Sequence, residues 1–406
     1  MKTAIRLLFC TVLVVSMLLT VFTGCSSDTD EKEPELIDSS TLPLDNGDLY
    51  GMCFELYPSW LTSGYDYQLV VDAMADMGVK NLRLWLHADY LMKDPVTFDE
   101  EKLEKYREYV DYVLSKGISV IGMNHHWFSG TSDNMATPMR DMSEGSAYRH
   151  FLLAYETTWY NLVSAFPEIT LWEIGNEWNN DVFLRPLEYK TQGLTYTVTE
   201  KARITLDMLY YASRGIHRAN PEAITMLGGL ADIDCGRLYN AKGFLNKLYE
   251  EIETGEYPST NPDHYFQTVA WHPYWGAEGD GVTDRWIQYN LDMYQIILDH
   301  EGHDKPVYFT ELGYSDMGQP DRDAKGAKVL TDMYTVVKEK MPFVQTVNWF
   351  RMFNDANASS WGSTSEMYNG LFYERGTENG FTLKQKGWAY YEIAGGTGDM
   401  SKYEGK

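Results

Sequence analysis

The amino-acid sequence predicts a single α/β domain built as a (β/α)8 barrel, and three observations support this prediction. Short apolar segments that suit buried strands alternate with segments of helical periodicity along most of the chain. Eight such pairs can be traced, and eight parallel strand–helix units suit a sheet that closes on itself. An open, doubly wound sheet would usually begin with a glycine-rich phosphate turn, and Gly51-Met52-Cys53-Phe54 lacks that glycine spacing.

The strand-like segments are short runs in which apolar, β-branched and aromatic residues dominate. They cover Leu49–Phe54, Asn81–Leu86, Ile118–Met123, Thr170–Ile174, Ile224–Leu227, Thr268–Trp271, Val307–Thr310 and Val344–Phe350. The segments between them have helical spacing of apolar residues, and several end at glycine or proline. They cover Tyr65–Met77, Lys102–Ser115, Ala147–Ala165, Glu200–Ala219, Phe244–Glu251, Trp286–His300, Lys325–Lys340 and Lys386–Ile393.

The N-terminus precedes the expected barrel and has the pattern of an export signal. Basic residues open residues 1–24, an apolar run extends to Phe22, and small residues lead to Cys25. This pattern resembles a bacterial lipoprotein signal peptide, which implies that Cys25 is lipidated after cleavage. We therefore expect an exported protein that is anchored to the cell envelope, with residues 25–48 as a flexible acidic tether and 49–406 as the barrel domain.

The charge balance excludes one class of function. The 406 residues carry 34 Lys and Arg against 59 Asp and Glu, which gives a formal net charge of −25. Nucleic-acid binding needs clustered basic residues, and anionic lipid would repel such a chain, so we expect contact with a membrane only through the lipid anchor. The hydrophobic share of 44% excludes wholesale disorder. A monomer is expected. Whether Cys53 and Cys235 form a disulfide stays open.

Polar residues gather at the C-terminal ends of the expected strands, where active sites lie in barrels of this kind. The strand ends contain Arg83 to His87, Asn124 to Trp127, Glu173 to Trp178, His272 to Trp275, Thr310-Glu311 and Asn348 to Arg351. Glu177 and Glu311 stand out because each follows an apolar strand, where a charge is costly without a purpose. A carboxylate pair with many aromatic residues indicates glycoside hydrolysis, in which one carboxyl protonates the leaving oxygen and the other faces the sugar. Glu173 is interpreted as a paired structural acid.

The sequences Ile174-Gly175-Asn176-Glu177 and Phe309-Thr310-Glu311 resemble the two catalytic motifs of glycoside hydrolase clan A. The whole set is most similar to family 5, the cellulase–mannanase family. Trp178 replaces the proline that commonly follows the first motif there, which leaves related families such as 39 open. The resemblance implies a retaining enzyme without a cofactor, in which Glu177 is the acid/base and Glu311 the nucleophile. It implies further supporting or substrate-binding roles for Arg83, His126, Asn176, His272, Tyr274 and Trp349.

Further residues are weaker candidates for substrate binding. They are His125, Trp178, Trp275 and Trp361, with Asp355 and Asn357 in the loop after the last strand. Adjacent residues of a strand point to opposite sides, so only one of His125 and His126 should serve the site, and His126 is favoured as the nearer to the strand end. No metal is predicted at this pair, because no carboxylate spacing completes a site.

We expect a retaining β-glycosidase that cleaves a β-linked polysaccharide or oligosaccharide of the mannan, glucan or xylan type. The alternative is a non-catalytic surface lipoprotein that binds glycans on a barrel scaffold. A two-lobed solute-binding lipoprotein is disfavoured by the uninterrupted alternation of strands and helices. The loops Phe128–Glu144 and Asp181–Thr199 are expected to shape the cleft, and endo or exo action stays open.

Overall fold

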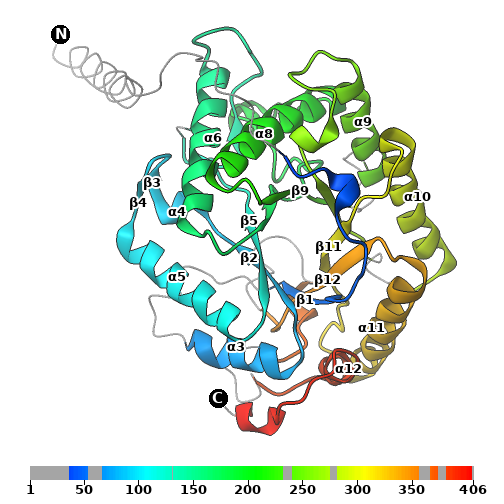
Figure 1. Ribbon diagram of the computed structural model, residues 1–406. Helices are drawn as coiled ribbons and strands as arrows, with labels where there is room; N and C mark the ends of the chain where they lie inside the picture. Colours follow the sequence, from blue (N-terminus) through cyan, green and yellow to red (C-terminus); the bar gives the residue numbers. More distant parts are fainter. Residues whose placement is uncertain are drawn as a thin grey trace. The chain divides into compact units, whose positions relative to one another are not determined.

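The computed structural model describes residues 36–53, 66–129, 131–231, 240–274, 281–355, 366–373 and 381–404. Parallel strands close into a barrel with the order β1-β12-β11-β10-β9-β7-β5-β2, which confirms the predicted fold class (Figure 1). The strands are β1 Tyr50–Cys53, β2 Asn81–Trp85, β5 Ser119–Asn124, β7 Leu171–Ile174, β9 Ile224–Ala231, β10 Thr268–His272, β11 Val307–Leu312 and β12 Val344–Phe350.

Helices surround the strands on the outside of the barrel (Figure 1). They are α3 Tyr67–Asp76, α5 Glu100–Ser115, α6 Ala147–Ala165, α8 Val198–Ala219, α9 Ala241–Glu253, α10 Asp284–Glu301, α11 Pro320–Lys340 and α12 Gln385–Ile393. Local sequence fixes several of their ends. Thr197 and Glu200 form a capping box at the start of α8, and Gly302, in a left-handed conformation, ends α10.

Strand β9 is longer than the sequence indicates, and two glycines explain the difference. The strand continues through Gly228 and Gly229 to Ala231, although glycines usually interrupt a strand pattern. A Cβ at Gly229 would lie 2.0 Å from Nε2 of His272 and 2.6 Å from Oγ1 of Thr310. The missing side chain therefore lets side chains from β10 and β11 occupy the space above β9.

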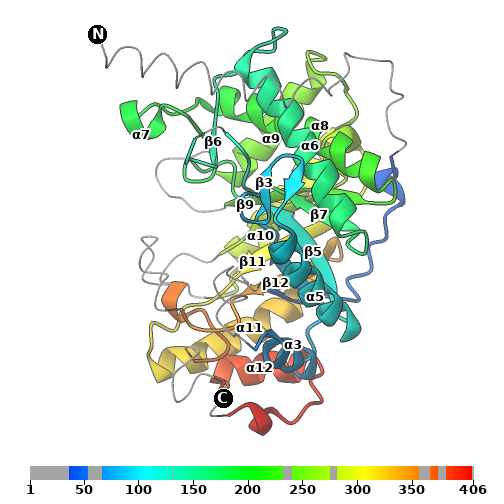
Figure 2. The ribbon, with the colours of Figure 1, turned by 90° about the vertical axis from the view of Figure 1, so that its left-hand side faces the viewer.

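The loops after β5 and β7 pair with each other at the carboxyl end of the barrel. Short strands β6 (Ala136–Thr137) and β8 (Arg185–Pro186) run parallel, and helix α7 (Tyr189–Gln192) follows them. Arg185 binds both carboxylate oxygens of Asp133, at 2.8 and 3.0 Å. These elements project from one end of the barrel (Figure 2). The two loops that were expected to shape the cleft thus form one joined wall.

The loop after β2 carries helix α4 (Ala88–Leu91) and the antiparallel strands β3 (Met92–Asp94) and β4 (Thr97–Phe98). These short elements have too few residues to show a periodic pattern, so the sequence did not predict them. Helix α4 directly follows His87, which is its N-cap residue.

Residues 36–48 lie against the opposite, amino end of the barrel (Figure 2). The backbone N–H of Ser39 donates to Asp263, and Gln267 donates to the carbonyl oxygen of Ile37. Asn81 and Thr346 both donate to the carbonyl oxygen of Asp48. The sequence placed these residues in the tether, and the structure assigns them to the barrel instead, because polar side chains near the strand starts bind their backbone.

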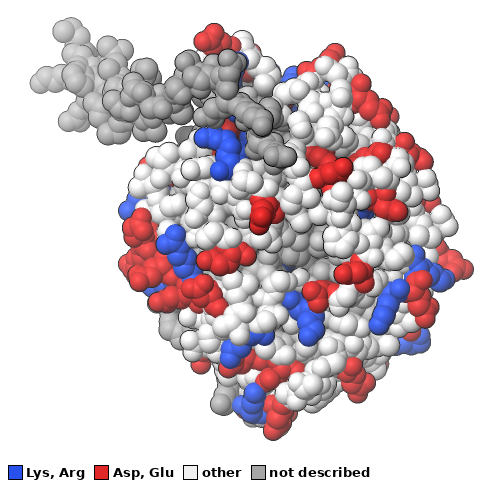
Figure 3. All heavy atoms as spheres, in the orientation of Figure 1, with Lys and Arg blue, Asp and Glu red and all other residues white. Residues whose placement is uncertain are grey.

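Positively and negatively charged side chains are interspersed on the surface at the amino end of the barrel. Lys and Arg are scattered among Asp and Glu on this face, in keeping with the net negative charge (Figure 3). Among the residues that the structure describes, no helix has the length and apolar composition needed to span a bilayer.

Candidate active site

Arg83 on β2 organises the carboxyl end of the barrel. Its side chain is completely buried and binds Glu173 through Nε at 2.5 Å and Nη2 at 2.9 Å. Nη1 lies 2.5 Å from Oε1 of Glu311, and Nη2 donates to Oδ1 of Asn176 at 2.8 Å. A buried guanidinium that serves two carboxylates and an amide is a rigid support. The interpretation of Glu173 as a paired acid agrees with this geometry.

Glu311 on β11 is held as a carboxylate. Burial would raise its pKa, but the charges of His272 and Arg83, together with hydrogen bonds from Arg83 and Tyr274, hold the pKa below the ordinary value. The phenol of Tyr274 donates to Oε2 at 3.1 Å. Burial and then the neighbouring Glu311 raise the pKa of Tyr274 well above its ordinary value, so this phenol stays protonated as a donor.

The backbone that positions Glu177 has unusual dihedral angles. Gly175, which follows β7, has φ of 84°, and Glu177 itself has φ of 47°, in the left-handed region that non-glycine residues seldom adopt. The N–H of Glu177 donates to the carbonyl oxygen of Gly229 at 2.8 Å, which fixes this conformation against β9. A side chain at Gly175 would collide with Trp178, since a Cβ there would lie 2.2 Å from the indole ring.

A chain of hydrogen bonds connects the carboxyl groups of Glu173 and Glu177. Thr310 Oγ1 lies 2.9 Å from Glu173 Oε1 and 3.1 Å from His272 Nε2, while His272 Nδ1 lies 2.8 Å from Glu177 Oε1. The Arg-bound carboxylate of Glu173 can only accept, so Thr310 donates to it and accepts from His272 Nε2–H. Because this proton is on Nε2, the hydrogen bond between Nδ1 of His272 and Oε1 of Glu177 requires a second proton, carried by one of these two atoms.

The two carboxyl groups predicted to be catalytic face each other. Glu177, His272 and Glu311 each offer a side-chain oxygen or nitrogen, and these atoms lie within 4.8 Å of one another. These residues lie far apart in the sequence, and the ends of β7, β10 and β11 bring them together at one end of the barrel.

Residues 46–350 match the model of the family described as cellulase, glycosyl hydrolase family 5. The chain belongs to glycoside hydrolase family 5. The predicted resemblance is confirmed, although Trp178 stands where the family commonly has proline. By family this protein is a glycoside hydrolase.

Solved structures of other glycoside hydrolases share the fold of this family 5 protein. A family 39 enzyme from Bacteroides cellulosilyticus has a TM-score of 0.56 and 17% identity, over 89% of this chain and 65% of that one. A GH5_18 enzyme from Bifidobacterium longum, in complex with Manβ1-4GlcNAc, has 0.59 and 14%, over 86% and 78%. A family 1 β-glucosidase from Thermotoga maritima has 0.60 and 14%, over 89% and 100%. No significant relative was found among curated proteins.

The predicted aromatic contacts differ from the structure in part. Trp349 is completely buried and its indole N–H donates to the carbonyl oxygen of Asn369, so its ring has no exposed face for a sugar. Trp178 is only 2% exposed and packs edge-on against Trp127, beneath the Gly175 turn. Trp178 is therefore a packing residue in this family 5 protein, and its predicted substrate contact is wrong.

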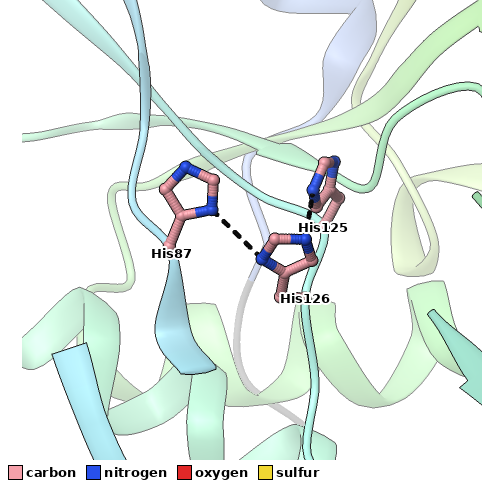
Figure 4. Close-up of side chains that lie close together, drawn as sticks. All are labelled: His87, His125 and His126. Carbon is pink, nitrogen blue, oxygen red and sulfur yellow. Dashed lines mark hydrogen bonds between the residues drawn. The ribbon is translucent and has the colours of Figure 1, made fainter. Parts of the chain in front are cut away.

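The strand periodicity predicts that the two adjacent histidines point to opposite sides. In the structure their rings instead contact each other (Figure 4). Strand β5 ends at Asn124, whose side chain binds both the N–H and the carbonyl oxygen of His126. The chain leaves the strand there, and Nε2 of His125 lies 2.7 Å from Nε2 of His126. His87, which the sequence did not single out as a site residue, contacts the same group.

Several predicted positions lie outside the described residues: Cys25, Trp275, Asn357, Trp361 and Cys235. Asp355 is described and binds Arg351 at 2.5 Å. Cys53 is buried on β1, with Sγ 3.8 Å from Nη1 of Arg83.

Proposed function

We propose that this protein is a retaining β-glycosidase that cleaves β-linked glycans by double displacement. The observation that carries the proposal is the short distance between two carboxyl groups that face each other. An oxygen of Glu177 lies within 4.8 Å of an oxygen of Glu311. Retaining enzymes have carboxyl groups about 5–5.5 Å apart, whereas inverting enzymes need roughly 6.5–9.5 Å to admit a water molecule.

In the first step, Glu311 attacks the anomeric carbon while Glu177 protonates the departing oxygen. The lowered pKa of Glu311 keeps this nucleophile ionised, because Arg83 and Tyr274 stabilise its negative charge. The proton shared between Glu177 and His272 is the one available for the leaving group. The product of this step is a glycosyl ester of Glu311.

In the second step, water attacks the anomeric carbon of the ester. Glu177, now ionised, accepts the proton of the water, and Glu311 leaves as a carboxylate. His272 can stabilise both charge states of Glu177, because its Nδ1 faces Oε1 of that residue at 2.8 Å. Asn176 is held by Arg83 beside the acid/base, which suits the predicted contact with the sugar 2-hydroxyl.

The substrate class is a β-linked mannan, glucan or xylan, or an oligosaccharide of one of them. Three structural neighbours support this choice: the GH5_18 complex with Manβ1-4GlcNAc, an exo-β-1,4-mannosidase from an Opitutaceae bacterium and the Thermotoga maritima β-glucosidase. The joined wall of the β6 and β8 loops supports a cleft that is bounded on one side.

The test replaces each carboxyl group and then supplies azide as an external nucleophile. Glu177→Gln and Glu311→Gln should each reduce turnover of aryl β-glycosides by about 10²–10⁴-fold or more, with unchanged thermal unfolding. With activated substrates, azide should give the β-glycosyl azide in Glu177→Ala and the α-glycosyl azide in Glu311→Ala. Wild-type rates in both Gln variants would overturn the assignment. Glycan binding by the wild type without any sugar release would favour the alternative glycan-binding role.

We also propose that the protein is lipid-anchored to the bacterial cell envelope through Cys25. The support is the order of basic residues, apolar run and Cys25 in the sequence. Labelling with radioactive palmitate should mark the wild type, and Cys25→Ser should remain unlabelled and uncleaved. Labelling of Cys25→Ser would contradict the proposal.

A further inference from the structure

A buried lysine joins the two loops that follow β11 and β12. Lys386, in the first turn of α12, is completely buried. Its Nζ donates to the carbonyl oxygen of Tyr314 at 2.8 Å and to that of Tyr368 at 2.7 Å, and lies 2.8 Å from Oδ2 of Asp316. Tyr314 and Asp316 belong to the loop after β11, whereas Tyr368 belongs to the loop after β12. One ammonium group therefore uses its three N–H donors on two separate loops.

A second buried lysine completes the cluster. Lys384 is 3% exposed, binds the same oxygen of Asp316 and donates to Oδ1 of Asn354, in the loop after β12, at 3.1 Å. Asp323, in α11, accepts from the backbone N–H of Lys386 and holds the start of α12. Buried ion pairs contribute little net stability, because the cost of desolvation offsets their attraction. The cluster is better explained by the geometry that it fixes.

On the β11 side, this geometry reaches the candidate nucleophile. Glu311 is only three residues before Tyr314 in the chain. Between them, Gly313 is packed so tightly that a Cβ there would lie 2.1 Å from the carbonyl oxygen of Phe350 and 3.3 Å from Nδ2 of Asn369. The loop after β11 therefore cannot shift independently of the chain that follows β12.

On the β12 side, Lys386 fixes the short 3-10 helix η5, Glu366–Tyr368, through the carbonyl oxygen of its last residue. After burial and Glu311, the charge of Glu366 is the next cause that raises the pKa of Tyr274. The phenol of Tyr274 donates to Oε2 of Glu311. Helix η5 therefore borders the candidate active site closely enough to act on it electrostatically.

We propose that Lys386 is a positioning residue for glycan binding, because it holds η5 and the loop after β11 in the conformation that receives the substrate. This inference rests on the proposed glycosidase function. Lys386 acts through backbone atoms of two loops, whereas Arg83 binds the carboxylate of Glu311 directly. Loss of the lysine should therefore affect the binding of a long glycan more than the chemical step on a small, activated substrate.

The first test compares Lys386→Met with the wild type on two substrates. Methionine keeps much of the apolar length of lysine and removes the ammonium group. The KM for a β-linked oligosaccharide should rise about tenfold or more, since a displaced loop loses its contacts with the glycan. The kcat for a dinitrophenyl β-glycoside should change by less than about threefold. An equal loss of kcat on both substrates, or unchanged kinetics on both, would overturn the proposal.

Two further variants control for folding and for the loss of a lysine as such. Lys328→Met removes an exposed lysine of α11, which pairs with Asp332, and should leave the kinetics on both substrates unchanged. Asp316→Asn removes the charge that both buried lysines share and keeps the shape of the side chain. It should give the same selective rise in KM, which decides the question if Lys386→Met does not fold in thermal unfolding experiments.

The pH dependence of binding is a readout that a purely structural role would not change. Burial, followed by the charge of Lys384, lowers the pKa of Lys386 to about 7, although Asp316 and Asp323 oppose this shift. These are the charged groups that face the ammonium from the start of α12, the loop after β11 and α11, and η5 contributes the carbonyl oxygen of Tyr368. Above this pH the neutral amine has only two N–H groups for its three acceptors.

Calorimetric titration of the oligosaccharide measures this dependence without turnover, in a Glu177→Gln background. The Kd should rise as the pH increases from about 6 to about 8.5, and the double variant with Lys386→Met should show a Kd at least about tenfold higher with no such rise. The same pH dependence in both proteins would refute the role of Lys386. Because binding needs no hydrolysis, a wild type that binds the glycan without cleaving it would contradict the proposed function alone. A Kd that is unaffected by Lys386→Met would contradict the positioning role alone.

Discussion

The imidazole of His272 contacts the acid/base candidate Glu177, with 2.8 Å between Nδ1 and Oε1. The same nitrogen lies 3.8 Å from Oε2 of Glu311, so a single ring faces both carboxyl groups. The opposite ring nitrogen is fixed by Thr310, which is in turn fixed by the Arg-bound Glu173. Thr310 therefore determines the protonation of Nε2 of His272, and through it the position of the proton between Nδ1 and Glu177.

Replacement of Thr310 by Val tests this arrangement. The hydroxyl is lost while the shape is kept, which leaves Nε2–H of His272 and one contact of Glu173 without a partner. A buried unsatisfied group costs about 1–3 kcal/mol. We expect kcat to fall roughly 10- to 100-fold on substrates with poor leaving groups. Dinitrophenyl glycosides need no proton from the enzyme and should be affected much less.

Thr310→Ser is the matched control, because it keeps the hydroxyl and removes only a methyl group. It should restore most of the activity on poor leaving groups. An equal loss for good and poor leaving groups in Thr310→Val would indicate a general structural defect and would contradict a role in proton placement.

Removal of the Arg83 charge should shift the pH profile of the enzyme. The charge of Arg83 is among the causes that lower the pKa of Glu311, whereas burial raises it. In Arg83→Met the pKa of Glu311 should rise, so the nucleophile is protonated at higher pH. We therefore expect the acidic limb of kcat/KM to move to higher pH, measured across a series of buffers at constant ionic strength. Arg83→Lys keeps a charge and should shift the limb less. An unmoved limb in folded Arg83→Met would refute this coupling.

Arg83→Met should also change stability in a pH-dependent way. Loss of one partner from a buried ion pair costs about 3–5 kcal/mol. A carboxyl with a lowered pKa stabilises the fold above its unfolded value, here 4.5, and loses that contribution as the pH falls through the folded pKa. The stability difference between wild type and variant should therefore be largest at neutral pH and narrow in acid. Urea unfolding at pH 7 and at pH 3.5 measures this difference.

The barrel could be predicted because each strand is a continuous apolar run and each helix has a clear period. Strand β9 was the exception, since Gly228 and Gly229 hide the continuation of the strand to Ala231. These glycines are explained by packing that sequence cannot reveal. The backbone of Ile174 and Gly175 occupies the space at Gly228, and the side chains of His272 and Thr310 occupy the space at Gly229. The segment 36–48 was missed for a similar reason, since most of the partners named above are more than two hundred residues away, as for Ser39 with Asp263 and Gln267 with Ile37.

The part of the site that is formed by residues at the carboxyl ends of the strands could be predicted from the sequence. Glu177, His272 and Glu311 meet because parallel strands present their carboxyl ends together. The histidine cluster could not be foreseen, because Asn124 ends the pleat at an unpredicted point and turns both adjacent rings to one side. His87 carries no distinguishing sequence signal, since a lone histidine after a strand is common.

Replacement of Gly229 by Ala should inactivate the enzyme without a change of any polar group. The new Cβ would lie 2.0 Å from Nε2 of His272, a distance that real structures do not show. His272 must move away from Thr310, and its contact with Glu177 should be lost. We expect turnover to fall by more than tenfold, measured with an aryl β-glycoside. Gly47→Ala is the control, because its Cβ would meet only ordinary contacts at 3.7 Å. Full activity in Gly229→Ala would show that the position of His272 is unimportant.

Removal of residues 36–48 should lower stability without a change in the chemistry. A chain that begins at Leu49 loses the bonds from Ser39 to Asp263 and from Gln267 to Ile37, at 3.0 and 2.7 Å. Each buried partner left unsatisfied costs about 1–3 kcal/mol, so the melting temperature should fall by several degrees relative to a chain that begins at Leu36. These contacts lie at the end of the barrel opposite α7 and the loop wall (Figure 2). Turnover per folded molecule at 20 °C should therefore be equal in the two chains. Equal melting temperatures would show that the segment contributes nothing and acts as part of the tether.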